Sequence, residues 1–419
     1  MVDFKPLQGL EFDTAVAGDF GSLISPPYDV VNATLRQKLV AANQYNIVRI
    51  TLPEAQGDLD RYAAAAKLAQ DWQARGVLKQ GPLAFYVVEQ RFASHHIEYT
   101  RTAIGGHLRL APWREGGVYP HEVTLPRPKA DRLSLYRSTR MQHGPVFSLF
   151  EDAGGAISRI VGRVKSGQVY REAEGPEGSY DRVWRVTDAG TLDELQKLFA
   201  KEKFFIADGH HRYETALAYR NEVASGKALP ADHPANFVLM FAVPFDDPGV
   251  VILPTHRLLC LDGDATAMGL GALSADYEIR DATLEDLGDV CSTPCETIGL
   301  YYCGGMHLLR MKEASREGFR GAVGELMADL NVFEVKEKVL PAFFSNVSAA
   351  IDQERIKYTH DLAEATSRID AGECAVALVL APITVRQMAK IASAGRTMPP
   401  KSTYFYPKLP TGVVMKALV

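Results

Sequence analysis

The stretch Phe204-Phe205-Ile206-Ala207-Asp208-Gly209-His210-His211-Arg212 decides how the middle of the chain folds. Its apolar beginning predicts a short buried strand that ends at a carboxylate. Gly209 permits a tight turn and a close backbone approach. Apolar residues then recur at helical spacing as far as Ala224, so we expect a strand, a sharp turn and a helix that ends near Ser225.

This turn concentrates residues that carry chemistry. We expect Asp208, His210 and His211 to be catalytic and Gly209 and Arg212 to bind phosphate. A helix N-terminus offers unpaired N–H groups and positive partial charge, and an arginine adds paired donors for phosphate oxygens. The alternative is that the two histidines are ordinary cap residues. A metal site is the rival to phosphate binding and is disfavoured, because adjacent histidine side chains rarely point the same way, so no residue is assigned as a metal ligand.

A second charged segment lies between residues 121 and 140. His121 and Glu122 precede a loop that is stiffened by Pro126 and Pro128, and Lys129 and Arg132 follow it. A carboxylate in a partly desolvated cleft is a candidate general base, so Glu122 is assigned that role, with the other three residues binding substrate or phosphate. No histidine stands three residues beyond Glu122, which excludes the zinc-protease pattern. The alternative for residues 129–140 is a solvated helix face.

The third segment is Met398-Pro399-Pro400-Lys401-Ser402-Thr403-Tyr404-Phe405-Tyr406-Pro407-Lys408-Leu409-Pro410. Its prolines lower the entropy cost of ordering and its aromatic residues favour burial. Lys401 and Ser402 are candidate anion ligands, and we expect the segment to return to the site formed by the middle of the chain. The alternative is a segment that only packs over the core.

Length and patterning give the broad architecture. The 419 residues suggest two domains, placed at 1–230 and 231–419. We expect helices over 33–42, capped by Asn32, and over 58–75, and a strand over 47–52. Strands and helices mix without strict alternation, so the expected fold class is α+β, with mixed sheets and helices.

Composition excludes some function classes. The chain has 46 Lys and Arg against 51 Asp and Glu, a formal net charge of −5, which argues against a dedicated nucleic-acid binder. The five cysteines are odd in number and scattered, which favours reduced thiols. No secretory signal and no apolar run of membrane-spanning length is found, so a cytoplasmic location is expected. The oligomeric state is left open.

The motifs together resemble a bacterial and archaeal family of full-length proteins that is filed as a domain of unknown function. Its marks are an N-terminal Pro-Tyr-Asp-Val-Val, a His-Glu-x-Thr followed by Lys-x-Asp-Arg, an Ala-Asp-Gly-His-His-Arg turn and a Met-Pro-Pro-Lys-Ser-Thr. Here they stand at residues 27–31, 121–124, 129–132, 207–212 and 398–403. The first motif adds Asp29 to the candidate substrate- or phosphate-binding residues.

The turn at Asp208 to Tyr213 is also similar to the turn of the ParB/sulfiredoxin-like fold, so the resemblance implies such an element around residues 203–225. Members of that fold include CTP-hydrolysing partition proteins, sulfiredoxins and free-serine kinases. The resemblance implies that His210, His211 and Arg212 handle phosphate. His210 stands where the sulfiredoxin turn has Cys, which disfavours sulfinic-acid reduction.

The leading hypothesis is a phosphoryl-transfer enzyme that acts on a small hydroxylated, anionic metabolite, with free serine or phosphoserine as first candidates. Such chemistry depends on positioning and charge neutralisation. The kinase and phosphatase directions stay open. ATP or ADP is the candidate cofactor, with Mg²⁺ as its companion. The alternative is a ParB-like nucleotide-binding regulatory protein that is associated with nucleic acid and has no metabolic catalysis.

Overall fold

The computed structural model describes residues 2–94, 96–124, 126–175, 177–263, 265–292 and 296–419. The chain divides into two compact units. Unit 1 comprises residues 1–120, 124–251 and 407–419, and unit 2 comprises residues 121–123 and 252–406. Mixed sheets with helices confirm the α+β class. The proposed domains 1–230 and 231–419 stay a prediction; in the structure β11 (Phe237–Pro244) pairs with strands of unit 1.

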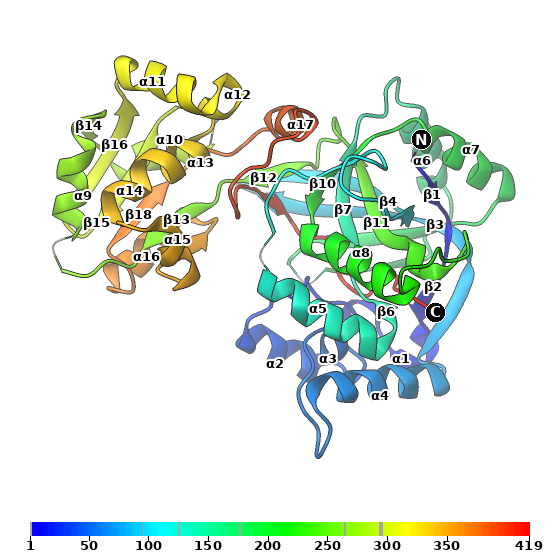
Figure 1. The fold of residues 1–419 in the computed structure, drawn as a ribbon. Helices are drawn as coiled ribbons and strands as arrows, with labels where there is room; N and C mark the ends of the chain where they lie inside the picture. Colours follow the sequence, from blue (N-terminus) through cyan, green and yellow to red (C-terminus); the bar gives the residue numbers. More distant parts are fainter. Residues whose placement is uncertain (1, 95, 125, 176, 264, 293–295) are drawn as a thin grey trace. The chain divides into compact units, whose positions relative to one another are not determined.

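A mixed sheet forms the centre of unit 1 (Figure 1). Its strand order is β5-β10-β7-β11-β4-β3-β9-β8, while β1 pairs with β4 and β2 pairs with β3. The strands are β1 (Phe4–Lys5), β2 (Leu7–Phe12), β3 (Leu78–Ser94), β4 (Ile97–Arg109), β5 (Val118–Tyr119), β7 (Val146–Phe150), β8 (Arg171–Glu174), β9 (Tyr180–Val186) and β10 (Phe204–Asp208), together with β11.

The helices of unit 1 cover this sheet and extend below it in Figure 1, where α4, α5 and α8 lie side by side. They are α1 (Thr14–Ala17), α2 (Ala33–Ala42), α3 (Val48–Thr51), α4 (Arg61–Ala74), α5 (Pro126–Thr139), α6 (Ala156–Lys165), α7 (Ala189–Phe199) and α8 (His210–Ala224), with short 3₁₀ turns at Phe20–Ser22 and Pro234–Asn236. Asn32 caps α2 as expected, since its side chain accepts from Leu35 N. The expected strand over 47–52 is wrong, because this stretch forms α3.

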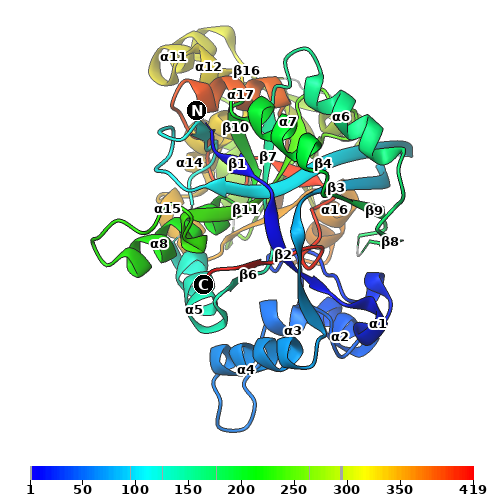
Figure 2. The same ribbon diagram turned by 90° about the vertical axis from the view of Figure 1, so that its right-hand side faces the viewer.

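The last residues of the chain are part of unit 1, which places both ends of the chain in this unit. Met415 pairs with Leu10, and Thr411 pairs with Ser25. The short strand β20 (Lys416–Ala417) pairs with β6 (Met141–Gln142), and Figure 2 shows the C-terminus beside β6. Phe4, Phe150, Phe199 and Phe204 meet in the core of the unit, with ring centroids 4.8–6.1 Å apart.

Unit 2 contains a second sheet with the order β14-β16-β15-β18-β13-β17. The strands of this sheet are β13 (His256–Leu259), β14 (Tyr277–Asp281), β15 (Ile298–Tyr302), β16 (Gly305–Met311), β17 (Ile356–Thr359) and β18 (Val376–Val379). A separate pair is formed by β12 (Val251–Leu253), which begins at the last residue of unit 1, and β19 (Tyr404–Tyr406). The helices of unit 2 are α9 (Ala265–Leu273), α10 (Leu284–Ser292), α11 (Glu313–Val323), α12 (Glu325–Ala328), α13 (Asn331–Glu334), α14 (Leu340–Phe343), α15 (Val347–Asp352), α16 (Leu362–Asp370) and α17 (Val385–Ser393), with a π-helical turn at Val335–Val339.

The oxidation state of two cysteines differs from the expectation of reduced thiols. Cys260 and Cys374 form a disulfide in the structure, where the sequence favours reduced thiols. The sequence separates them by 114 residues, but the antiparallel pairing of β13 with β18 brings their Cα atoms to 4.1 Å. This long-range pairing is the reason why spacing along the chain did not reveal it. Cys295 lies outside the described residues.

Candidate functional site

The strand, turn and helix expected around residue 208 are present. β10 ends at Asp208, and α8 begins at His210. Gly209 lies between them with a φ of 90°, a left-handed conformation that glycine adopts without strain. A Cβ atom at this position would lie 2.9 Å from Nε of Arg212. The glycine therefore lets the arginine side chain fold back against the turn.

Asp208 is held between two cations. Its Oδ1 accepts a hydrogen bond from Nζ of Lys408 at 2.7 Å, and its Oδ2 forms an ion pair with Arg212. The side chains of Asp208 and Lys408 are 15% and 6% exposed. Burial by itself would raise the pKa of Asp208, but Lys408 and Arg212 outweigh it and hold the pKa well below its usual range. The carboxylate is therefore ionised at neutral pH.

Further buried charges surround this pair. Lys408 N donates to Oε2 of Glu177 at 2.8 Å, and Arg101 donates to the carbonyl oxygen of Pro407 at 2.5 Å. Burial lowers the pKa of Arg101 to about 10 and raises the pKa of Glu177. We call Asp208, Arg212, Lys408, Arg101 and Glu177 the Asp208 cluster. All five residues belong to unit 1.

The N-terminal motif reaches this cluster through Tyr28. The guanidinium of Arg132 lies 4.1 Å from the centroid of the Tyr28 ring. Burial raises the pKa of Tyr28, Asp29 adds to this effect, and Arg212 opposes it. Asp29 itself is exposed and stabilises the charged form of Arg212. Residues from three of the predicted motifs thus lie near the Asp208 turn.

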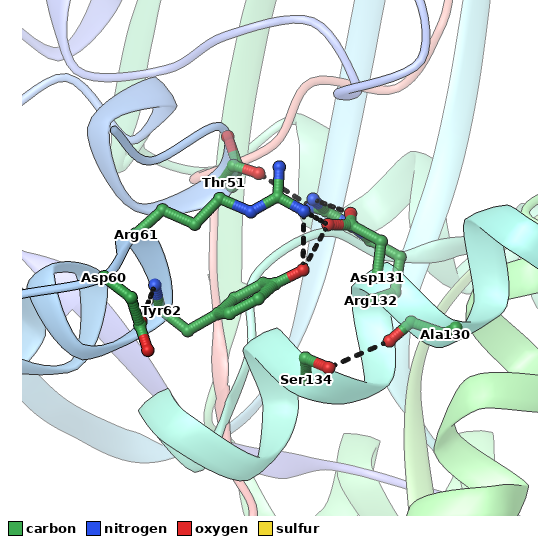
Figure 3. Close-up of polar contacts among 8 residues, drawn as sticks. All are labelled: Thr51, Asp60, Arg61, Tyr62, Ala130, Asp131, Arg132 and Ser134. Atoms are coloured by element: carbon green, nitrogen blue, oxygen red, sulfur yellow. Dashed lines mark hydrogen bonds and ion pairs between the residues drawn. The ribbon is translucent and has the colours of Figure 1, made fainter. Parts of the chain in front are cut away.

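Arg132 is fixed by a local network, which Figure 3 shows. Its guanidinium donates to Oδ2 of Asp131 and to the carbonyl oxygen of Thr51, the latter at 2.7 Å. The other oxygen of Asp131 accepts from Arg61 and from the Tyr62 hydroxyl, each at 2.8 Å. Burial would raise the pKa of Asp131, but Arg132 and these partners lower it. Arg132 therefore joins α5 to the segment around α3 and α4.

The two histidines lie in the first turn of α8. His210 is 6% exposed, and its ring centroid lies 6.4 Å from that of Trp113. Its charged form contributes to lowering the pKa of Asp208, so the two side chains are electrostatically linked. His211 is half-buried. An unperturbed histidine changes charge near neutral pH, which suits proton transfer.

Lys129 of α5 has its partner on α8, the helix that carries the two histidines. Its Nζ lies 2.8 Å from Oε2 of Glu214, which also accepts from Thr124 at 2.6 Å. Trp113 Nε1 donates to the other oxygen of Glu214 at 3.0 Å. Burial would raise the pKa of Glu214, but Lys129 and the two donors lower it. Lys129 thus neutralises a carboxylate of α8.

The remaining predicted residues meet in unit 2. Met398 N donates to the carbonyl oxygen of His121 at 2.7 Å, and Lys401 N donates to Oε1 of Glu122 at 3.1 Å. His121 Nε2 lies 2.9 Å from the hydroxyl oxygen of Thr403, and the Ser402 hydroxyl donates to the carbonyl oxygen of Pro399. We call His121, Glu122, Lys401, Ser402 and Thr403 the Glu122 cluster.

Arg257 supports the Glu122 cluster from β13. It is buried, and its Nη2 donates to the carbonyl oxygen of Lys401 at 3.2 Å. Burial lowers the pKa of Arg257 to about 10, while Tyr358 and Glu122 raise it. Lys401 itself is exposed and has a φ of 59°. The backbone of the Lys-Ser-Thr loop is thus fixed, while the lysine side chain is accessible.

Sequence reasoning missed Lys408, Arg101 and Arg257. Lys408 stands in the quoted C-terminal segment between Pro407 and Pro410, and this proline spacing was the available signal. Nothing in the sequence distinguishes Arg101 within β4 or Arg257 within β13. Over the described ranges, no group of three or more His, Cys, Asp or Glu side chains is placed to hold a metal ion.

The fold and the site define a mixed α+β protein with a buried, ion-paired strand-to-helix turn. The chain belongs to the family described as protein of unknown function (DUF1015), whose model matches residues 4–333. This confirms the family that the motifs resemble. No curated protein matches the chain. In the part of the chain that the structure describes, none of the helices has the length and apolar character needed to cross a membrane.

The solved structures that are similar to the chain include three different proteins. A conserved hypothetical protein from Pyrococcus furiosus has 12% identity and a TM-score of 0.38, covering 72% of this chain and 92% of its own. A free serine kinase in complex with AMP has 10% identity and a TM-score of 0.35, covering 71% and 89%. SbnI with C-terminal truncation from Staphylococcus aureus has 11% identity and a TM-score of 0.37, covering 72% and 84%.

Proposed function

We propose that this protein is a phosphoryl-transfer enzyme that acts on a small hydroxylated metabolite, with free serine as the first candidate. The observation that carries the proposal is the pair of cations on Asp208. Lys408 and Arg212 both bind this one carboxylate at the turn into α8. Two cations against one anion leave positive charge for a phosphate beside the N–H groups of the first helical turn.

The low pKa of Asp208 helps to decide which residue of the turn takes which catalytic role. An acid with a strongly depressed pKa is a poor proton acceptor near neutral pH, so Asp208 holds Lys408 and Arg212 in place. His211, half-buried in the first turn of α8, is the better candidate for taking the hydroxyl proton of the substrate. His210 lies electrostatically close to Asp208 and contacts a phosphoryl oxygen.

In the kinase direction, the substrate hydroxyl oxygen forms a bond to the terminal phosphorus of ATP or ADP, and the bond from that phosphorus to its bridging oxygen breaks. Arg212 and Lys408 neutralise the oxygens of the transferred group, which is the main requirement of this chemistry. Asp29 is an exposed carboxylate near Arg212 and fits a Mg²⁺ ion carried by the nucleotide. With water as the nucleophile, the same groups serve a phosphatase.

The roles of Glu122 as base and of His121, Lys129, Arg132, Lys401 and Ser402 as anion ligands stay predictions. Glu122 and Lys401 contact one another in unit 2 through a backbone N–H, so a change at either residue tests the same cluster. Lys129 is occupied by Glu214, so a role for it in phosphate binding requires that this ion pair opens.

The test uses the full chain and ³¹P NMR. ATP or ADP with L-serine and Mg²⁺ is expected to give phosphoserine, and phosphoserine alone reports the hydrolase direction through inorganic phosphate. Arg212→Lys is expected to lower the rate at least tenfold, because the loss of paired contacts to a charged group costs roughly 1.5–3 kcal/mol. Arg171→Lys is the matched control, since Arg171 is a buried arginine that contacts Glu11 and Phe12 instead.

A second candidate is a nucleotide-binding regulatory protein. The observation that favours it is again the ionised Asp208, because a phosphate can bind beside Lys408 and Arg212 without any proton acceptor. Calorimetric binding of ATP or CTP that Arg212→Lys weakens, with no turnover of serine or phosphoserine, would select this function. No binding and no turnover would reject both candidates.

A further inference from the structure

A charged cavity lies at the C-terminal end of α8, the end that is remote from Asp208. It has a volume of about 450 Å³, which falls within the usual range for small-molecule sites. It is formed by the last turns of the helix, the loop that follows, the end of β4 and the 3₁₀ turn at Pro234–Asn236. The residues that line it are Arg109, Arg220, Asn221, Ala224, Gly226, Lys227, Ala228, Leu229, Ala231 and Asn236.

All the charged side chains that line this cavity are positively charged. Arg109, Arg220 and Lys227 contribute three cations, and the named lining contains no carboxylate. The hydrogen bonds of Arg220 go to neutral acceptors, namely the carbonyl oxygen of Leu110 at 2.8 Å and Oδ1 of Asn221. Its charge is therefore not cancelled by these partners. The chain as a whole has a net charge of −5, so this concentration of cations is local.

Arg109 and the loop between Pro230 and Asn236 are held in place before a ligand arrives. Arg109 donates to Oδ2 of Asp3 at 2.8 Å and to the carbonyl oxygen of Ala231 at 2.9 Å. Its guanidinium also lies 4.6 Å from the centroid of the Phe237 ring. Asn236 donates to the carbonyl oxygen of Pro230 at 2.7 Å, which fastens the loop. Fixed donors lose little conformational entropy when they bind an anion.

The cavity is separate from the turn at Asp208. α8 has 15 residues, so its two ends lie about 21 Å apart. The C-terminal end of a helix carries negative partial charge, which opposes an anion and favours cations there. The charges of Arg220 and Lys227, together with that of Arg109 in its ion pair with Asp3, exceed the half charge of that end. Lys227 follows the helix after Gly226, which has a φ of 79° and turns the chain away from the helix axis.

We propose that this cavity binds a small polyanion, a molecule that carries a phosphate group or several carboxylates. The amides of Asn221 and Asn236 offer hydrogen bonds to its oxygens, and Leu229 with Ala224 offers a small apolar surface to its carbon skeleton. The site is independent of the proposed phosphoryl transfer, because it shares no residue with the Asp208 cluster.

The experiment is calorimetric titration of the full chain with pyrophosphate and, in parallel, with citrate. The two probes distinguish a phosphate ligand from a carboxylate ligand. Lys227→Glu is expected to weaken binding of the preferred probe at least tenfold, because it replaces an attraction by a repulsion. Raising the salt concentration should weaken binding in the wild type, since Lys227 is exposed and its field is screened.

Two control variants make the result decisive. Lys197→Glu reverses an exposed lysine on α7 that pairs with Asp193, outside the cavity, and should leave binding unchanged. Arg212→Lys alters the turn at Asp208 and should also leave the binding at this cavity unchanged. The inference is overturned if Lys227→Glu binds both probes like the wild type, or if Arg212→Lys alone removes the binding. Neither result depends on whether the protein transfers phosphate.

Discussion

The Asp208 cluster is held together mainly by ion pairs between side chains, whereas the Glu122 cluster is held mainly through backbone atoms. Lys408 and Arg212 each place a charged group on Asp208. Lys401, by contrast, is fixed by its N–H and its carbonyl oxygen, while its side chain is exposed. In the first cluster the charges themselves hold the structure, and removal of one leaves the remaining buried charges with fewer partners. In the second cluster a side chain can change while the loop stays ordered.

The largest expected effect comes from Lys408→Met. It leaves Asp208 and Arg212 buried without their third partner, and breaking a buried ion pair costs about 3–5 kcal/mol of unfolding free energy. Denaturant unfolding followed by tryptophan fluorescence measures it. Trp72, Trp113 and Trp184 all lie in unit 1, so this signal reports on the unit that contains Asp208. A loss below 1 kcal/mol would show that the pair contributes little.

A smaller effect is expected for Arg212→Lys. Lysine cannot reach both Asp208 and the carbonyl oxygen of Pro145 as the guanidinium does. The variant should lose about 2–3 kcal/mol in the same fluorescence transition, the scale of a hydrogen bond to a charged group. Arg257→Lys in unit 2 is the comparison, and it should leave the tryptophan transition where it is. Equal shifts in both variants would contradict the separate assignment of the two clusters.

The pH dependence separates the units further. Burial raises the pKa of Asp181 in unit 1 to about 6 from its ordinary value of 3.8. The folded state therefore binds a proton that the unfolded state releases, and stability falls as the pH rises from about 4 to about 6. Asp181→Asn should remove this decline and raise the unfolding free energy at pH 7 by about 1–2 kcal/mol. Tryptophan-monitored unfolding at several pH values tests it.

Glu334 provides the matching test in unit 2. Burial raises the pKa of Glu334 to about 7 from its ordinary value of 4.5, so the stability that its protonated form contributes is lost as the pH rises through this window. Glu334→Gln should flatten the pH dependence of unit 2 in circular dichroism and leave the tryptophan transition of unit 1 unchanged. A shift of the tryptophan signal would mean that the two units unfold as one.

The smallest expected effect on stability is that of Lys401→Ala. An exposed side chain without a structural role usually changes the unfolding free energy by less than about 0.5 kcal/mol. If Lys401 binds the substrate anion, the variant should still lose turnover or ligand affinity. A variant that matches the wild type in melting temperature, turnover and affinity would leave the Glu122 cluster with a packing role only.

The sequence predicted the parts of the site that are local. The apolar run before Asp208 and the glycine after it determine a strand, a turn and a helix within a few residues, and the structure confirms these elements. Residues 47–52 were misjudged as a strand. Their β-branched residues favour a strand locally, but Ile47 N bonds to the carbonyl oxygen of Leu23 and the stretch closes into a helical turn. Tertiary contacts overrode the local preference.

Long-range contacts could not be predicted from the sequence. Lys408 meets Asp208 across 200 residues, and no periodicity or motif records such a contact. The sequence predicts that the C-terminal segment returns to the middle of the chain and singles out Lys401. The residue that contacts Asp208 is Lys408 instead. The segment was identifiable from its prolines and aromatic residues, because these act locally. The choice between its two lysines depends on the direction of the chain after Tyr406.

The return of the last residues to unit 1 has a consequence for the folding of the protein during its synthesis. Residues 252–406 of unit 2 are inserted between two parts of unit 1, so a ribosome finishes the inserted segment before it delivers Lys408 and β20, the strand that pairs with β6. The first part of the chain to be made is thus among the last to be completed, against the usual N-terminal-first order of domain folding. A chain that stops before residue 408 lacks one of the two cations that pair with Asp208. Copies that end before residue 408 would therefore carry an Asp208 cluster that lacks Lys408.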